Sequence, residues 1–180
     1  SWAATAVYEH GDKKIVCKHN RIQSILIIPT SWLGYFLAHR ETYFLKKLRG
    51  LPGIPKCYEV YSVDGKRLRN AAAHDFVPGA PMSLVSQLPE KFFENLFQLI
   101  HELHRHRIAY VDLHKQENVI VGDDGRPYLI DFQISLQLPN IVGFRSLFKL
   151  LAQSDLYHVQ KHQLRRGCEH WAYAYIEKPW

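Results

Sequence analysis

The stretch YVDLHKQENVIVGDDGRPYLIDFQIS, residues 110–135, sets two aspartates and an asparagine at the edges of two short apolar runs. The runs NVIVG and PYLIDF are typical of strands, and the DDG between them indicates a turn, so the stretch predicts a hairpin after a loop. Asn118 enters the first strand and Asp131 ends the second. Folding the hairpin therefore brings these two residues side by side, with Asp112 in the preceding loop.

Oxygen-bearing side chains in this arrangement fit phosphoryl transfer. That reaction needs Mg²⁺ on the phosphates, a cation on the α- and β-phosphates, and an acceptor aligned with the γ-phosphate. Carboxylate and amide oxygens suit Mg²⁺, which binds through few protein groups because it keeps water and phosphate in its shell. Asn118 and Asp131 are the candidate ligands, and Asp112 is free to meet the acceptor hydroxyl.

Each of these residues also has a plainer interpretation. Asp112 and Asn118 could be turn formers at a loop-to-strand junction, where Asp and Asn are common. Asp131 is harder to explain in that way. A carboxylate directly after the apolar YLI would lose hydration unless it met a cation, a hydrogen-bond donor or open solvent. We therefore interpret Asp131 as a metal ligand.

The composition is that of a folded protein. Of 180 residues, 47% are hydrophobic and 13% aromatic, which is enough to bury a sizeable core in one domain or two tightly joined lobes. Cys17, Cys57 and Cys168 lie far apart without a C-x-x-C pair, so neither a zinc site nor a disulfide framework is indicated. The most apolar stretch, from Ile25, is too short and Pro-interrupted to cross a bilayer, and no leader-like segment opens the chain. The expectation is a cytoplasmic protein without a transmembrane segment.

The net charge of +6 is unevenly spread. Residues 1–70 carry 12 Lys/Arg against 5 Asp/Glu, residues 71–144 carry 5 against 9, and residues 145–180 carry 6 against 3. The basic flanks could attract a nucleotide, an anionic lipid or nucleic acid, or could be solvated charge without a partner. Lys161, Arg165 and Arg166 pose the same choice: a solvated helix face, or a peripheral contact with an anionic acceptor or membrane surface.

Strands and one helix are expected in the first half of the chain, and mainly helices in the second. The strands ATAVYEH and KKIVCKH form a hairpin turning at Gly11-Asp12, and two more strands turn at Asp64-Gly65. Helices are expected over residues 31–48, 89–107 and most of 144–180. This order is α+β, with a seam at DFVPGAP where a crevice between the halves would bind a ligand.

The opening stretch resembles protein kinases. Y-V-D-L-H-K-Q-E-N followed by I-D-F-Q is similar to the catalytic loop H-R-D-L-x-x-x-N and the D-F-G of that family. Upstream, I-V-C-K resembles the third-strand V-A-I-K, R-E-T-Y-F-L-K-K-L resembles the kinase C-helix, and H-D-F-V-P-G resembles the hinge. Downstream, Asp155 falls where kinases carry a helical aspartate that braces the catalytic loop. The matches cover roughly residues 3–160, and their common order is more specific than any single motif.

The resemblance implies a compact two-lobed protein-kinase-like α+β fold with a reduced C-terminal helical lobe. Residues 1–180 would form one kinase-like domain, with 1–77 as the N-lobe and 78–180 as the C-lobe. The implied cofactors are ATP and Mg²⁺, and the implied activity is transfer of the γ-phosphoryl group to a hydroxyl.

The resemblance also assigns a role to each matched residue. Lys18 would orient the α- and β-phosphates, Glu41 would hold Lys18, the backbone of Asp75 and Val77 would meet the adenine edge, Asn118 and Asp131 would ligate Mg²⁺, and Asp112 would orient the acceptor hydroxyl or accept its proton. Taken alone, Lys18 is a strand-end lysine and Glu41 fits a surface pattern with neighbouring cations. The role of each therefore depends on the other.

Two departures concern the first kinase motifs. No G-x-G-x-x-G precedes Lys18, so the phosphate-covering loop is either missing, reduced to something around Ser1-Trp2-Ala3, or cut by the start of the chain. The His-Arg of the catalytic loop is replaced by Tyr110-Val111. This removes the arginine that many kinases use to read an activation-loop phosphate, and switching by such phosphorylation is not expected.

Further departures follow Asp112. Asp112 and Asn118 are six positions apart where the kinase motif has five, so either the loop bulges by one residue or Glu117 is the residue in register. Gln133 stands at the third D-F-G position and lacks glycine's tolerance of positive φ, so large flips of this segment should be harder. There is no A-P-E, and only 47 residues follow Gln133, which indicates a minimal kinase.

Shortened kinases with these features resemble RIO-type atypical kinases and the small bacterial enzymes that phosphorylate lipopolysaccharide core sugars. The first comparison implies a Ser/Thr hydroxyl as acceptor, which we prefer, and the second a heptose or related sugar hydroxyl. A hypothesis from another class is a nucleotide-binding pseudokinase or scaffold, and nucleic acid is not expected as a partner. The H-E-L-H of residues 101–104 lacks zinc-protease spacing, so its histidines are expected on a solvated helix face.

Overall fold

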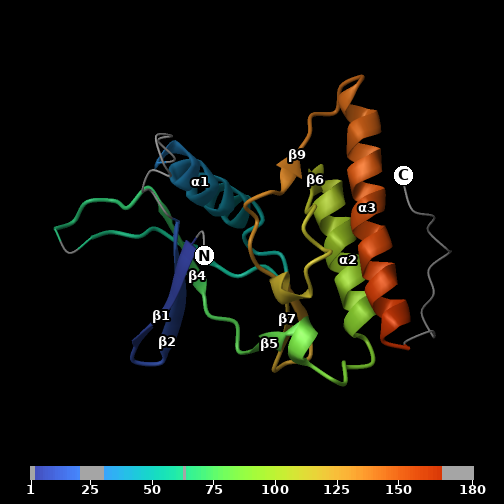
Figure 1. Ribbon diagram of the computed structural model, residues 1–180, viewed down its shortest axis with the longest axis horizontal. Coiled ribbons are helices and arrows are strands. Elements are labelled where there is room, and N and C mark those ends of the chain that lie inside the picture. Colours follow the sequence, from blue (N-terminus) through green and yellow to red (C-terminus); the bar gives the residue numbers. More distant parts are fainter. Residues whose placement is uncertain (1–2, 21–30, 63, 168–180) are drawn as a thin grey trace, which may run out of the picture. The chain divides into compact units, whose positions relative to one another are not determined.

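The computed structural model describes residues 3–20, 31–62 and 64–167 (Figure 1). The chain divides into two compact units. The first contains the chain up to Val77 together with Asp131–Gln133, and the second contains Pro78–Ile130 and the chain from Ile134 onwards. A short segment late in the sequence therefore belongs to the unit that the first half builds.

The sheet of the first unit begins with the expected hairpin. Strands β1 (Ala3–His10) and β2 (Lys13–Asn20) pair antiparallel around a two-residue turn in which Gly11 has a φ of 58°. Strands β4 (Ala71–Asp75) and β3 (Cys57–Tyr58) complete the sheet in the order β1-β2-β4-β3. The two strands expected to turn at Asp64-Gly65 are confirmed, because β3 pairs antiparallel with β4 and a bridge between Tyr61 and Arg67 lies nearer the turn.

Helix α1 (Ser31–Lys47) contacts β2, β3 and β4 (Figure 1). It ends one residue before the predicted end at Leu48, which is itself buried. The helix buries a stripe of residues spaced three or four apart: Ala38, Glu41, Phe44, Leu45 and the adjacent Leu48. All but one are apolar, so Glu41 is a charged residue in an apolar stripe.

The second unit contains small antiparallel sheets. Strands β5 (Gly79–Pro81), β7 (Val119–Gly122) and β8 (Pro127–Leu129) pair in that order, and β6 (Ile108–Ala109) pairs with β9 (Leu136–Gln137). Short 3₁₀ turns lie at η1 (Met82–Leu84) and η2 (Gln116–Asn118). The β7–β8 pair is the hairpin predicted from the opening stretch, with Val119 opposite Leu129.

Helices α2 (Phe92–Arg105) and α3 (Phe144–Arg165) lie side by side in the second unit (Figure 1). The apolar stripe predicted for α2 is buried, as is Phe97. The stripe consists of Phe92, Phe93, Leu96, Leu99, Ile100 and Leu103. The long helix expected from Phe144 is confirmed as far as Arg165, and residues 168–180 lie outside the described part of the chain. In the described ranges, no helix combines the length and apolar character needed to cross a bilayer.

Candidate active site

Three charged side chains predicted from distant motifs meet in the first unit. Lys18 Nζ lies 2.7 Å from Asp131 Oδ2 and 3.8 Å from Glu41 Oε2. The side chain of Glu41 is 1% exposed and that of Lys18 16%, whereas that of Asp131 is 30% exposed. One cation therefore faces two carboxylates, one deeply buried and one partly exposed.

Strand alternation sets the direction of Lys18. Cys17 packs with Ala71 and Ala73 on one side of the sheet, so Lys18, the next residue of β2, points to the other. Asp131 follows β8 and has a φ of 62°, a left-handed conformation that costs a non-glycine residue free energy. Its neighbour Phe132 is buried in the first unit, with its ring centroid 6.4 Å from that of Phe44.

Burial raises the pKa of Glu41 from 4.5 to about 6. Loss of hydration is the main cause. Lys18 and a hydrogen bond from Gln133 act against it, whereas the charge of Asp131 adds to it. A carboxyl group with a perturbed pKa, held next to a cation and a second carboxylate, is typical of functional sites.

Gln133 makes contacts that the motif comparison did not predict. Its side-chain Nε2 donates to Asn20 Oδ1 and to Glu41 Oε2, each at 3.0 Å. Its carbonyl oxygen accepts a hydrogen bond of 2.8 Å from Arg40 Nε. The residue at the third D-F-G position therefore binds both β2 and α1.

The predicted hinge residues, Asp75 and Val77, lie at and just after the end of β4. The Asp75 N–H donates to the Lys56 carbonyl at 2.9 Å, and its carbonyl oxygen lies 2.8 Å from Nδ1 of the buried His74. Burial lowers the pKa of His74, so the neutral ring donates from Nδ1 to that oxygen. A carbonyl oxygen has a second lone pair, so contact of the Asp75 backbone with an adenine edge stays a prediction.

Asp112 and Asn118 meet in the second unit. Asn118 Nδ2 donates to Asp112 Oδ2 at 2.7 Å, and both residues are buried. Glu117 is exposed, so Asn118, rather than Glu117, is the residue that contacts Asp112, and both belong to the 3₁₀ turn η2. The Ile130 N–H donates to the Asn118 carbonyl at 3.1 Å, which ties the end of the hairpin to its start.

Asp112 is 3% exposed, and its hydrogen-bond donors in the described part of the chain contact only one of its carboxylate oxygens, Oδ2. Besides Asn118, Lys115 Nζ lies 2.9 Å from its Oδ2. Its Oδ1 has no hydrogen-bond partner among the described residues, although His114 Nδ1 lies 3.4 Å away. A buried carboxylate oxygen without a donor is costly, which makes Oδ1 a natural acceptor for an incoming hydroxyl.

The loop that carries Asp112 is held by a buried aspartate of α3. Asp155 accepts the backbone N–H groups of Tyr110 and Val111, each at 2.8 Å, and its Oδ2 lies 3.0 Å from His104 Nε2. Val111 has a φ of 72°, an outlier for a β-branched residue. Asp155 thus makes the bracing contacts implied by the kinase resemblance.

A histidine of α3, which sequence reasoning did not single out, supports the same loop. His162 is 3% exposed, and burial lowers its pKa, so its ring is neutral. Its Nε2 donates to the Leu113 carbonyl at 2.8 Å, and its Nδ1 accepts from Gln116 Nε2 at 3.0 Å. Its position seven residues after Asp155 on one helix face was the available signal.

Two expectations are corrected. The side chain of His104 is only 10% exposed because it contacts Asp155, so its assignment to a solvated helix face is wrong, whereas His101 is exposed as expected. Arg166 donates to the carbonyls of Val85 and Met82, so it is neither a solvated residue nor a free cation for an anionic surface.

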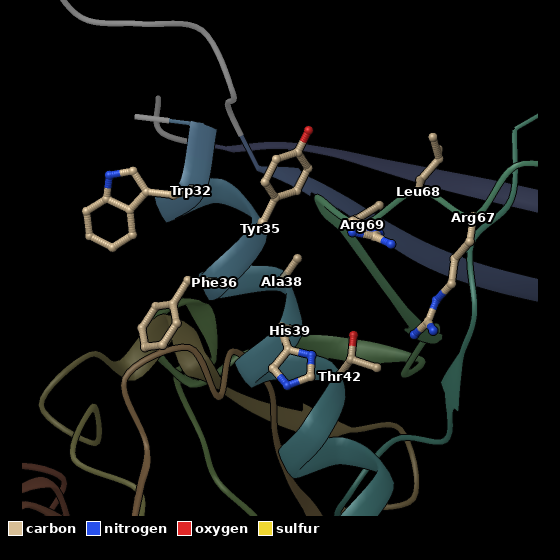
Figure 2. A pocket seen from close by; sticks show the side chains of 10 residues that line it. Trp32, Tyr35, Phe36, Ala38, His39, Thr42, Arg67, Leu68 and Arg69 are labelled. Carbon is tan, nitrogen blue, oxygen red and sulfur yellow. The ribbon is translucent and has the colours of Figure 1, made fainter. Parts of the chain in front are cut away.

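The first unit also has an open hollow of about 670 Å³ beside α1 (Figure 2). Its walls come from α1 and from residues 67–71. The lining residues are Trp32, Tyr35, Phe36, Ala38, His39, Thr42, Arg67, Leu68, Arg69 and Ala71. Because Lys18, Glu41 and Asp131 are not among them, this hollow is not the site predicted from the sequence.

The predicted residues therefore form two groups. Lys18, Glu41 and Asp131 meet in the first unit, and Asp112 and Asn118 meet in the second. Ser1 and Trp2, considered as a remnant of the phosphate-covering loop, lie outside the described residues.

Comparison with known proteins gives a fold and no sequence family. No protein-family model matches the chain, and no curated protein matches it. Among solved structures, the Rio2 kinase–ADP/Mg²⁺–phosphoaspartate complex from Chaetomium thermophilum resembles it with a TM-score of 0.63 and 17% identity, over 99% of this chain and 60% of that one. The bifunctional kinase-methyltransferase WbdD resembles it with a TM-score of 0.59 and 18% identity, over 90% of this chain and 38% of that one.

These likenesses confirm a protein-kinase-like α+β fold with a small helical part, of the kind found in the Rio2 kinase and in WbdD. The chain spans 60% of the first structure's length and 38% of the second's. At 17% and 18% identity the likeness concerns the fold. Activity must therefore be argued from this chain's own residues.

Proposed function

We propose that this chain is an ATP- and Mg²⁺-dependent phosphotransferase that transfers the γ-phosphoryl group to a hydroxyl. The observation that carries the proposal is the cluster of Lys18 with Asp131 and Glu41. One cation cannot neutralise two carboxylates, and Glu41 is 1% exposed. The cluster is therefore short of positive charge, and a divalent cation would supply it.

The proposed ligands of Mg²⁺ are Asp131 and Asn118, whose oxygen atoms are of the kind that Mg²⁺ prefers. Asn118 uses Nδ2 on Asp112, so its Oδ1 remains for a cation. Asp131 uses Oδ2 on Lys18, and the described residues give its Oδ1 no partner. One carboxylate and one amide oxygen suit Mg²⁺, which completes its shell with water and phosphate oxygens. When bound, the ion would neutralise charge that develops on the phosphates.

The side chains of this chain would supply the remaining functions. Lys18 would bind the α- and β-phosphates once a metal ion competes for Asp131, and Glu41 would then hold the ammonium group. Asp112 would orient the acceptor hydroxyl through its unpartnered Oδ1 and accept its proton. The protein thus contributes positioning and electrostatics, which is most of what phosphoryl transfer requires.

We propose a Ser/Thr hydroxyl as the acceptor. This choice follows the resemblance of the sequence motifs to RIO-type kinases, and their resemblance to the kinases of lipopolysaccharide core sugars leaves a sugar hydroxyl as the alternative. Incubation with labelled ATP, once with a panel of protein substrates and once with lipopolysaccharide core acceptors, decides between them. Labelled protein supports our choice, and labelled core sugar alone replaces it.

The activity itself is tested at Asp131. Asp131→Asn keeps the left-handed backbone, which Asn tolerates, but removes the negative charge. We expect ATP consumption to fall at least a hundredfold while the thermal unfolding midpoint changes little. Asp64→Asn, a charge removal at an exposed turn, is the matched control. If Asp131→Asn consumes ATP like the wild type, the assignment is wrong.

Measurements on the wild-type protein separate an enzyme from a pseudokinase. A thermal shift with Mg·ATP, followed by a search for ATP consumption, gives both results for the wild type. Binding with turnover supports the proposal. Binding without turnover favours a nucleotide-binding scaffold.

A further inference from the structure

The side-chain amide of Gln133 donates hydrogen bonds to two buried residues. Both N–H bonds of its amide are used, one on Asn20 Oδ1 and one on Glu41 Oε2, at 3.0 Å each. Asn20 and Glu41 are each 1% exposed, so water cannot readily replace the donor. The backbone carbonyl oxygen of Gln133 also accepts a hydrogen bond, from Arg40 Nε. The residue therefore joins β2 and α1 within the first unit.

The oxygen of Glu41 that Gln133 contacts is the one that faces the lysine. Lys18 Nζ lies 3.8 Å from Oε2, and Gln133 Nε2 lies 3.0 Å from the same atom. The amide thus orients the carboxylate toward Lys18. Asn20 depends on the same contact, because its own Nδ2 has no hydrogen-bond partner in the described part of the chain.

Asp131 lies two residues before Gln133 in a backbone conformation that needs support. Its φ of 62° is sparsely populated for a residue other than glycine, and such residues persist only where their surroundings hold them. Phe132, between the two, is fully buried. The contacts of Gln133 and the burial of Phe132 fix the segment directly after Asp131.

We propose that Gln133 is a positioning residue that, by bridging Asn20 and Glu41, holds Asp131 and Glu41 against Lys18. This inference rests on the proposed phosphotransferase function. It also gives a physical reason for glutamine at this position. A glycine would supply no donor for either buried oxygen, so another contact would be needed to hold α1.

The test is a double-mutant cycle between Gln133 and Glu41, with kcat/KM for ATP and the affinity for Mg·ATP as readouts. Gln133→Met keeps the side-chain length and removes both donors. We expect it to lower both quantities about tenfold in the wild-type background and by a clearly smaller factor in a Glu41→Ala background, where only its effect on Asp131 remains. Residues that act through one another show such non-additivity, whereas a residue needed only for stability does not. Equal losses in both backgrounds overturn the proposal.

A second variant keeps the test decisive if Gln133→Met folds poorly. Gln133→Glu is isosteric but places an acceptor against two acceptors, so we expect kcat/KM for ATP to fall about a hundredfold below that of the wild type. Gln87→Glu makes the same change at an exposed residue of the second unit and should stay within twofold of wild type. A Gln133→Glu protein that folds and retains wild-type kcat/KM contradicts the proposal.

Failure of the underlying function has a different signature. A wild-type protein that neither binds nor consumes Mg·ATP overturns the phosphotransferase assignment and this role of Gln133 together. A wild-type protein that consumes ATP while its Gln133 variants match it overturns the role of Gln133 alone.

Discussion

Asp155 accepts the backbone N–H of Val111 at 2.8 Å and so holds a β-branched residue at a φ of 72°. The strained residue directly precedes Asp112, the proposed acceptor of the hydroxyl proton. Strain of this kind costs about 1–3 kcal/mol and is found where function requires a particular backbone conformation. The position of Asp112 therefore depends on a side chain 43 residues later in the sequence.

Replacing Asp155 tests that dependence. Asp155→Asn keeps one acceptor oxygen and sets an amide donor against a buried N–H, so we expect a loss of about 2–4 kcal/mol in the free energy of unfolding. ATP turnover should fall at least tenfold under conditions where the variant is folded. Chemical denaturation and steady-state assays measure the two effects, with the exposed Asp64→Asn as control. An active variant with wild-type stability would show that the loop needs no such support.

Asp112 should separate binding from chemistry. Asp112→Asn keeps the shape of the side chain but removes the base, so we expect kcat to fall by about 10²–10⁴. The thermal shift with Mg·ATP should persist, because Lys18 and Glu41 are unaffected. Comparing calorimetric binding with turnover checks this. Loss of binding in parallel with turnover would mean that Asp112 holds the nucleotide rather than the acceptor.

Glu41 should limit stability at neutral pH. Its pKa is raised from 4.5 to about 6, so its protonated form favours the folded state, and that contribution is lost as pH rises through about 6. Glu41→Gln is neutral at every pH and avoids this loss. We expect its free energy of unfolding to exceed that of the wild type by up to about 2 kcal/mol at pH 7.5, with a smaller difference at pH 5. Each tenfold change in proton affinity corresponds to about 1.4 kcal/mol.

Denaturant titrations at both pH values measure this difference. The variant should also lose activity, which is the trade-off expected where a buried charge serves function. A variant less stable than wild type at pH 7.5 would show that the attraction to Lys18 outweighs the cost of burial.

The same pKa predicts the acid limb of the activity profile. The pH dependence of kcat/KM reports groups of the free enzyme, so activity should fall below a pH of about 6 as Glu41 is protonated and releases Lys18. ATP itself titrates nearby, and the Glu41→Gln variant is the control because it retains only that part. Identical acid limbs in the two proteins would exclude Glu41 as the titrating group.

Local sequence patterns predicted most of the secondary structure. The alternation around Gly11-Asp12 gave the β1–β2 hairpin, and the apolar stripe after Pro89 gave α2, because strand and helix periods are written in neighbouring residues. The two strands expected to turn at Asp64-Gly65 also formed, as the antiparallel pair of β3 and β4 with a further bridge between Tyr61 and Arg67.

Motif order predicted the charged cluster but not its support. Lys18, Glu41 and Asp131 were expected together and lie together. His104 was misread as a surface residue because its partner, Asp155, lies 51 positions away on another helix. No local pattern distinguishes a histidine that meets a buried carboxylate from one in solvent.

The sequence by itself predicted that Lys18 and Asp131 would meet, because motifs resembling the kinase V-A-I-K and D-F-G occur in the chain in the order of that family. Only the tertiary structure decided that Asn118, rather than Glu117, contacts Asp112. It also decided that Gln133 bridges Asn20 and Glu41, which lie 113 and 92 positions away from it in the sequence. The physical reason is that periodicity and turn chemistry act between neighbours. Hydrogen bonds between distant residues exist only after the hydrophobic core has brought their elements together.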